Sequence, residues 1–163
     1  MEEIVIKSYS EGYKDDVIDL ILDIQQNEFN IPINREDQPD LSDIPNFYQS
    51  GNGNFWVALC NGQVIGTIAL IDIGNHQGAL RKMFVKATYR GNRYNAANLL
   101  LLQLIAWARE RDVHDIYLGT TEKFLAAHRF YEKNRFAQID RETLPGAFPI
   151  MKVDTRFYKL THL

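Results

Sequence analysis

The spacing of apolar positions changes repeatedly along the chain, and each change marks an element of secondary structure. Period-two alternation and short apolar runs predict strands, whereas apolar positions three or four residues apart predict helices. Val17, Leu20, Ile21 and Ile24 follow the helical spacing. The pattern predicts strands at residues 1–9, 55–60, 63–73, 80–85, 115–120, 135–140 and 150–160, and helices at residues 11–27, 41–48, 96–111 and 122–134.

Turn residues separate these elements. Asn61-Gly62 lies between two apolar runs and is the strongest hairpin signal in the chain. Glycine-rich stretches at 51–53 and 74–78 predict the turns before and after this hairpin. The three strands joined in this way form an antiparallel meander. Residues 30–39 contain two prolines and many polar residues, and residues 144–149 contain two more, so both segments are predicted loops.

Polar residues stand at the expected helix starts. Ser10 is the candidate N-cap of the first helix, Asp40 or Ser42 of the second, and Thr120 or Thr121 of the last.

The stretch from Ala79 to Arg111 combines a strand, a basic turn and a nearly continuous apolar helix. The first N–H groups of a helix lack intrahelical partners and carry partial positive charge, so a helix that follows a strand in this way can hold phosphate. Arg90 and Arg93 can add charge-assisted hydrogen bonds to phosphate oxygens. The turn has one glycine and no Gly-Lys-Ser/Thr, so it is neither a dinucleotide fingerprint nor a P-loop. The alternative is an ordinary connection with two solvated arginines.

Two blocks of sequence resemble the GNAT superfamily of N-acetyltransferases. The first is Tyr-Arg-Gly-Asn-Arg-Tyr-Asn-Ala-Ala-Asn-Leu-Leu from Tyr89, which is similar to that family's acyl-CoA pyrophosphate loop, Arg/Gln-x-x-Gly-x-Gly/Ala. The second is Ile-Tyr-Leu-Gly-Thr from Ile116, followed by Ala-His-Arg-Phe-Tyr-Glu-Lys-Asn-Arg-Phe from Ala127, which is similar to the family's A-x-x-(F/L)-Y-x-K-x-G-F. The blocks stand in family order at family spacing, so the resemblance covers essentially the whole chain.

The resemblance implies an α+β (mixed α/β), GNAT-like fold over a single domain, residues 1–163. That fold has a central, mostly antiparallel sheet of six to seven strands flanked by about four helices. It also implies acetyl-CoA as acyl donor, bound along a central strand that separates from its neighbour beside Val85. The implied cofactor-binding residues are Met83, Phe84, Val85, Arg90, Gly91, Asn92, Arg93, Tyr94, Asn95, Ala96, Phe124 and Ala127.

Several residues depart from the family pattern. Arg93 and Asn95 stand at loop positions where the family has glycine or alanine, and Arg135 replaces the glycine of the second block. Phe124 stands where many relatives have asparagine, and Ala79 where many have a glutamate base. These changes leave the fold intact and bear on catalysis.

Acetyl transfer to an amine requires a base for the amine, a donor for the oxyanion and an acid for the thiolate. Tyr131 matches the family's tyrosine and is the candidate general acid, because a phenol stays protonated at neutral pH. A buried core tyrosine is the competing interpretation.

Asp72, at the end of its strand, is the candidate base. Glu28, His76, Glu122 and His128 are chemically able alternatives, and a water chain or no protein base also remains open.

The resemblance also suggests that the second helix and its flanking loops cover the acceptor pocket. Phe29, Phe47 and Tyr48 would then line it, with core packing as the alternative role for each.

Composition narrows the function classes. The 163 residues carry a formal net charge of −3, which argues against a nucleic-acid surface. The single cysteine, Cys60, excludes an intrachain disulfide, and the four histidines show no metal-ligand spacing, so no metal is expected. No targeting segment or membrane-spanning run is predicted, so we expect a cytoplasmic protein with no membrane partner.

The sequence therefore predicts an N-acetyltransferase that acts on a small-molecule amine, or less readily on a protein amine. The alternatives are a catalytically impaired acyl-CoA-binding or regulatory module of the same fold, and a globular α+β domain with coincidental similarity. The oligomeric state is open, with a homodimer as the commonest assembly.

Overall fold

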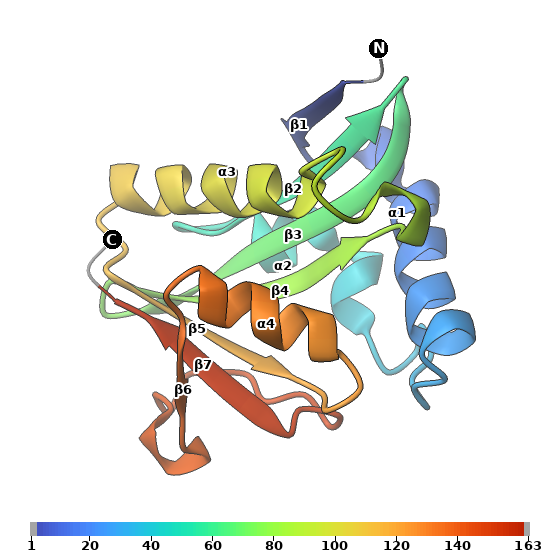
Figure 1. The fold of residues 1–163 in the computed structure, drawn as a ribbon. Helices are drawn as coiled ribbons and strands as arrows, with labels where there is room; N and C mark the ends of the chain where they lie inside the picture. The colour runs from blue at the N-terminus through green and yellow to red at the C-terminus, as the bar shows by residue number, and fades with distance from the viewer. Residues whose placement is uncertain (1–2, 162–163) are drawn as a thin grey trace.

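A computed structural model describes residues 3–161 and contains one seven-stranded sheet with helices on both faces (Figure 1). The strand order is β1-β2-β3-β4-β5-β7-β6, and β4 with β5 is the one parallel pair among these neighbours. The predicted meander is confirmed, because β2, β3 and β4 pair antiparallel in sequence. The strands are β1 (Ile4–Ser8), β2 (Asn54–Cys60), β3 (Gln63–Gly74), β4 (Gln77–Val85), β5 (Asp115–Thr120), β6 (Ala137–Ile139) and β7 (Arg156–Leu160).

Within the described residues, four α-helices divide between the two faces of the sheet. They are α1 (Lys14–Leu22), α2 (Ile44–Tyr48), α3 (Ala96–Glu110) and α4 (Leu125–Lys133). The helices α3 and α4 pack on one face, and α1 and α2 pack on the other (Figure 1). The predicted fold class is confirmed in strand number, in its mostly antiparallel pairing and in its four helices.

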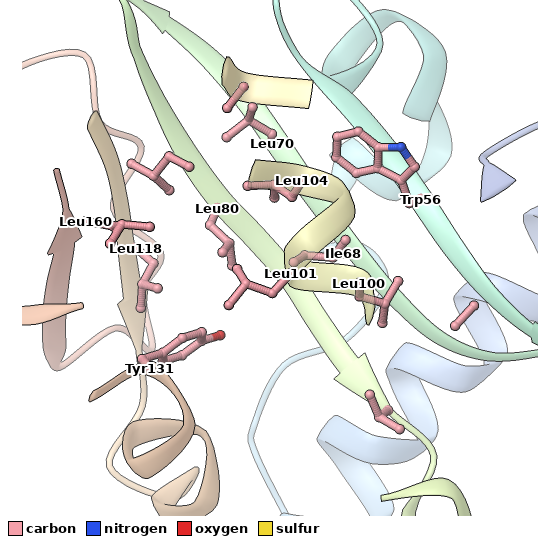
Figure 2. Close-up of a cluster of buried hydrophobic side chains, with 14 of the residues drawn as sticks. Trp56, Ile68, Leu70, Leu80, Leu100, Leu101, Leu104, Leu118, Tyr131 and Leu160 are labelled. Carbon is pink, nitrogen blue, oxygen red and sulfur yellow. The ribbon is translucent and has the colours of Figure 1, made fainter. Parts of the chain in front are cut away.

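The larger core lies between α3 and the sheet. Leu100, Leu101 and Leu104 point from α3 into a cluster that includes Ile68 and Leu80 (Figure 2). Each of these five side chains is almost fully buried. Removing buried aliphatic side chains from water is the main favourable term in folding, so this cluster fixes α3 against the centre of the sheet.

The first helix is less regular than its sequence predicts. Residues 11–27 form a 3₁₀ turn (Glu11–Tyr13), the helix α1 and a π-helical segment (Asp23–Glu28). Ser10 precedes the 3₁₀ turn, and its side chain makes no capping hydrogen bond. Ile24 and Gln25 of the π-helical segment are buried, and such segments are frequent at functional sites. Met1 and Glu2 of the first predicted strand lie outside the described residues.

The second helix starts later than predicted. Its N-cap is Asp43, which accepts a hydrogen bond from the Asn46 N–H at 3.4 Å, and neither Asp40 nor Ser42 fills that role. A separate 3₁₀ turn (Pro39–Ser42) precedes it.

The predicted boundaries near the C-terminus are also wrong. The strand expected at 150–160 is only β7, because residues 151–154 form a turn. In that turn the Met151 N–H donates to Asp154 Oδ2 at 2.9 Å, and the Asp154 N–H donates to the Met151 carbonyl at 3.0 Å. The strand predicted at 135–140 is only β6.

The last helix likewise starts later than predicted. Its N-cap position is Phe124, without a side-chain capping bond, instead of Thr120 or Thr121.

Two departures from the family pattern occupy backbone conformations that favour glycine. Asn95 has φ = +57° and Arg135 has φ = +73°. Asparagine tolerates the left-handed region because its short polar side chain can hydrogen bond locally, whereas arginine at this φ is strained. Arg135 is exposed. The substitution therefore places strain in the α4–β6 turn without disturbing the core.

We expect Arg135→Gly to stabilise the protein by about 1 kcal/mol, or ~2–4 °C in melting temperature, because glycine adopts this φ freely. Thermal unfolding followed by circular dichroism measures the change. Arg135→Ala is the matched control, since it removes the same side chain and keeps the Cβ that causes the strain. An equal gain from both variants would show that the arginine side chain, and not the backbone, is unfavourable.

Candidate active site

A cavity of about 460 Å³ opens where β4 and β5 separate. Their parallel pairing covers Gln77–Ala79 of β4 and then ends, while β4 continues to Val85 beside β3 and β5 continues to Thr120 beside β7. The second half of β4 therefore has a free edge that faces the cavity. An unpaired strand edge can bind an extended ligand by backbone hydrogen bonds.

The backbone direction at Val85 follows from the β3–β4 ladder. The Lys86 N–H donates to the Ile65 carbonyl of β3 at 2.8 Å. Successive N–H groups on a strand point to opposite sides, so the Val85 N–H points away from β3 and toward the cavity. This is the orientation needed for a donor to a thioester oxygen.

The N-terminus of α3 stands at the mouth of this cleft and is not capped by its own residues. Asn95, the N-cap residue, uses its side-chain oxygen to accept from Asn98 Nδ2 at 2.6 Å instead of from a backbone N–H. The described residues supply no acceptor for the backbone N–H groups of Ala96, Ala97 and Asn98. Gly91, at φ = +98°, makes the sharp turn into this loop. The arrangement leaves an uncapped helix N-terminus beside a basic loop, which favours an anion.

Arg90 lies between this loop and the cavity and already contacts a carboxylate. Its Nε donates to the Val85 carbonyl at 2.8 Å, and both terminal nitrogens donate to Glu28, one of them at 2.7 Å. The guanidinium group also lies over the Phe29 ring, 5.7 Å from its centre. The Glu28 carboxylate therefore occupies the donors that a phosphate would use.

The segment from Glu28 to Asn30 also reaches the opposite wall of the cleft. Lys123 Nζ donates to the carbonyls of Phe29 and Asn30 at 3.3 and 2.8 Å. The Phe29 and Phe124 rings meet edge to face, with 4.8 Å between their centres. Residues 28–30 thus bridge the β4–α3 loop and the β5–α4 loop across the cleft.

Tyr131 of α4 is on the wall of this cavity. Figure 2 shows its ring beside Leu118 of β5, with the hydroxyl directed toward β4. Burial raises the pKa of Tyr131 well above its usual value. The described residues supply no hydrogen-bond partner for its hydroxyl, which is therefore available to a ligand in the cavity.

The structure does not bring Asp72 to the cavity. Its two carboxylate oxygens accept the N–H groups of Asn52 at 3.0 Å and Gly74 at 2.9 Å. Asp72 therefore holds the turn before β2 and the end of β3, and it is not among the residues that line the cavity with Tyr131.

The alternative bases also lie outside the cavity lining. Glu28 pairs with Arg90, and Glu122 pairs with Arg156 at 3.3 Å. The ring nitrogens of His76 and His128 contact the carbonyls of Asp112 and Thr121, at 3.0 and 2.9 Å.

Among residues 3–161, the carboxylate that does line the cavity is Asp154, which the sequence analysis missed. Burial raises the pKa of Asp154 above its ordinary value, and hydrogen bonding to Met151 and the nearby Arg81 and Lys82 oppose the rise. Residues 150–155 carry an apolar pattern typical of a strand, so no sequence signal placed this aspartate in a turn facing the cleft.

Most of the residues expected to bind the cofactor surround the cleft. Met83, Phe84, Val85, Arg90, Gly91, Phe124 and Ala127 line the cavity, and Asn92, Arg93, Tyr94, Asn95 and Ala96 form the loop and helix start at its mouth.

Of the three aromatic residues expected at the acceptor pocket, Phe29 lines the cavity. Tyr48 is fully buried in the second core and Phe47 is partly exposed, and both lie outside the lining.

Residues 3–161 contain no cluster of three or more histidine, cysteine, aspartate or glutamate side chains that could hold a metal ion. Over the same residues, no helix has both the length and the apolar character that crossing a bilayer requires.

Comparison with known proteins finds a matching family and similar solved structures. The model of the acetyltransferase (GNAT) family matches residues 18–136. A GNAT-family acetyltransferase structure from Staphylococcus aureus Mu50 is 44% identical, covers 97% of this chain and 98% of its own, and has a TM-score of 0.94. An acetyltransferase structure from Streptococcus agalactiae is 34% identical, covers 99% of this chain and 100% of its own, and has a TM-score of 0.93.

A third solved structure is similar to this chain in fold alone. It is the PaiA N-acetyltransferase of Thermoplasma acidophilum in complex with coenzyme A, 18% identical, with a TM-score of 0.78 over 98% of this chain and 99% of its own.

Among curated proteins, the N-acetylaspartate synthetase of Xenopus tropicalis is 34% identical over 114 residues, which are 66% of this chain and 41% of that protein. The human N-acetylaspartate synthetase is 31% identical over 112 residues, 66% of this chain and 36% of that protein. The chain spans about two fifths of the length of these relatives.

The Glu28–Arg90 pair gives a testable prediction about coenzyme A. If a diphosphate takes the Arg90 donors, it must displace Glu28, so Glu28→Gln should tighten coenzyme A binding. Partly exposed ion pairs contribute ~0.2–1 kcal/mol, which corresponds to a Kd about 1.5- to 5-fold lower by isothermal titration calorimetry. Glu36→Gln, an exposed glutamate in the following loop, makes the same charge change away from Arg90 and should leave the Kd as it is. Weaker binding in Glu28→Gln would mean that the carboxylate orients Arg90 instead of competing for it.

Proposed function

The chain belongs to the GNAT family of acetyltransferases, and on that premise we propose that it transfers the acetyl group of acetyl-CoA to the primary amine of a small molecule. One observation carries the proposal. The free edge of β4, the uncapped N-terminus of α3 and the Tyr131 hydroxyl converge on a single cavity.

Each part of acetyl-CoA has a matching group in this cleft. The diphosphate fits the N–H groups at the start of α3 together with Arg90, once Glu28 is displaced. The pantetheine arm carries amides that can pair with the free edge of β4 like an added strand. That path leads to Val85, whose N–H can donate to the thioester oxygen.

The reaction is a direct attack. The amine nitrogen forms a bond to the thioester carbonyl carbon, and the oxygen becomes an oxyanion that the Val85 N–H stabilises. The carbon–sulfur bond then breaks, and the thiolate of coenzyme A takes a proton from the Tyr131 hydroxyl. The amine proton leaves to the base, and Tyr131 is reprotonated through solvent. The products are the N-acetylated amine and coenzyme A.

Asp154 is our candidate for the base, because it is the carboxylate that lines the same cavity as Tyr131. Its raised pKa makes it a better proton acceptor than an ordinary aspartate, directly or through one water. Ala79, where many relatives have a glutamate base, was one reason to consider an inactive acyl-CoA-binding module. A base at Asp154 removes that reason. The asparagine at position 95, where the family has glycine or alanine, was a second reason. It loses its force because Asn95 adopts the backbone conformation that glycine favours.

Tyr131→Phe tests the assignment of the acid. We expect turnover to fall at least ~10-fold, the low side of what one positioned acid–base group supplies, while the Kd of acetyl-CoA stays the same. Thiol release measures turnover over a panel of amines. Full activity in Tyr131→Phe would remove the hydroxyl from the mechanism, and acetyl-CoA binding without thiol release in the wild type would favour the binding module.

Asp154→Asn tests the base and has a second readout in stability. We expect kcat/KM to fall about 100-fold, and more than in Asp72→Asn, which tests the alternative base. The pKa of Asp154 is raised in the folded state, so its ionisation costs stability as the pH rises through that pKa. Asparagine cannot ionise, so the variant should melt above the wild type at neutral pH, and this difference should vanish at a pH below the ordinary carboxyl range. A larger loss of activity in Asp72→Asn, or no pH-dependent gain in melting temperature, would contradict the assignment.

A further inference from the structure

A β-bulge in β4 turns two successive cations toward one side of the sheet. In the β3–β4 register Thr67 faces Phe84 and Ala69 faces Arg81, so Lys82 and Met83 together face one residue of β3. Lys82 has φ = +55°, and its carbonyl accepts the Thr67 hydroxyl at 2.7 Å, which holds the bulge in place. Successive residues of a regular strand point to opposite faces. Here the side chains of Arg81 and Lys82 both reach the carboxylate of Asp40.

Asp40 is shared among more donors than it can satisfy well. Its Oδ2 accepts the Tyr48 hydroxyl at 2.5 Å and lies 3.5 Å from Lys82 Nζ, but 4.0 Å from the nearest nitrogen of Arg81. Lys82 has a second partner, because its ammonium donates to the buried Gln38 side chain. Gln38 in turn exchanges hydrogen bonds with Gln25 at 2.9 and 3.1 Å. Lys82 and Asp40 thus belong to one connected polar network.

Arg81 is left with weak partners. Its side chain is only 9% exposed, and its one hydrogen bond within the described residues goes to the Met151 sulfur at 2.7 Å, a weak acceptor. A guanidinium group has five N–H donors, and burying them without strong acceptors is unfavourable. The Phe47 and Tyr48 rings hold the group in place, 5.8 and 6.0 Å from its carbon. Arg81 lines the cavity, so its spare donors are available to a ligand there.

A carboxylate of opposite charge lies in the same part of the cavity without neutralising Arg81. The charge of Arg81 opposes the rise that burial causes in the pKa of Asp154, yet the two side chains form no ion pair within 4.0 Å. Apolar side chains, among them Ile33, Phe148 and Val153, complete this end of the cavity. The site therefore presents a cation and a carboxylate that are separated from each other, which complements a ligand with both an ammonium and a carboxylate group.

We propose that Arg81 binds a carboxylate of the acceptor, and that the acceptor is an amino acid whose free amine faces Asp154. This inference rests on the proposed acetyl transfer and adds the class of acceptor. The carboxylate gives the Arg81 fork the two oxygens that suit it. The amine is then placed beside the group that removes its proton. An acceptor without a carboxylate leaves Arg81 with the Met151 sulfur and the Asp40 carboxylate, which is 4.0 Å away and already shared with Tyr48 and Lys82.

The test compares binding first, so that it does not depend on catalysis. Each of the twenty standard amino acids and its carboxamide is titrated into the 163-residue protein saturated with coenzyme A, and binding is followed by calorimetry. The amide has nearly the same size and keeps the amine, but it lacks the negative charge. We expect at least one amino acid to bind, and its amide to bind at least ~10-fold more weakly, as loss of a charge-assisted bidentate contact implies. Equal binding of acid and amide, or no binding by any amino acid, would overturn the proposal.

Two variants locate the effect at Arg81. Arg81→Gln should bind acid and amide equally, and Arg81→Lys should keep part of the preference through its charge. Coenzyme A affinity and melting temperature show whether each variant is folded, and the acid–amide comparison within the wild type stands without them. A preference for the acid that persists in a folded Arg81→Gln would place the carboxylate site elsewhere.

Thiol release with the acids that bind then reports on the reaction separately. Amino acid binding without thiol release would refute the proposed transferase and leave the carboxylate site standing. Thiol release with simple amines only, together with equal binding of acid and amide, would support the transferase and refute the carboxylate site at Arg81.

Discussion

The early end of pairing between β4 and β5 is the constraint on which the rest of this protein depends. Beyond Ala79, β4 remains hydrogen-bonded to β3 and β5 remains hydrogen-bonded to β7, so each strand stays paired on one side. A free edge inside a folded protein exposes backbone donors and acceptors whose burial without partners is unfavourable. The cavity of about 460 Å³ keeps this edge accessible, and a ligand with its own amides can complete the ladder. The opening is thus both a defect of the sheet and the place where chemistry can occur.

Several charged groups around the opening have partners in the protein that a ligand could replace. At the mouth, Arg90 pairs with Glu28, and residues 28–30 span the cleft to Lys123 and Phe124. At the inner end, the nearly buried Arg81 has one hydrogen bond, to the Met151 sulfur, and lies 4.0 Å from Asp40. Burial raises the pKa of Asp154, a second carboxylate at this end. A diphosphate at the first position and an acceptor at the second would each take over donors that the protein alone leaves poorly matched. The two halves of the proposed reaction are thereby built into opposite ends of one cavity.

Departures from the family pattern have local explanations in the backbone. Asn95 and Arg135 occupy left-handed conformations, one tolerated and one strained. The glutamate that many relatives have at position 79 has no counterpart at Ala79, which is fully buried against Tyr117 and Phe157, and the cavity instead holds Asp154 from a different loop. In the proposed reaction, the carboxylate that serves as base comes from a different segment, one that lines the same cavity.

The amino-acid sequence by itself determined the meander, the buried helix α3, the basic turn before it and the position of Tyr131. These features depend on contacts between near neighbours: the Asn61-Gly62 turn, the apolar spacing of α3, and the strand-turn-helix order around Gly91. The tertiary structure alone decided that Asp72 holds a turn, that Asp154 faces the cleft, and that Arg81 and Lys82 point to the same side. Strand alternation would place these two cations on opposite faces, and only the bulge opposite Ile68 brings them together. A bulge and a closed turn depend on partners far along the chain, and a linear pattern of polar and apolar residues does not contain that information.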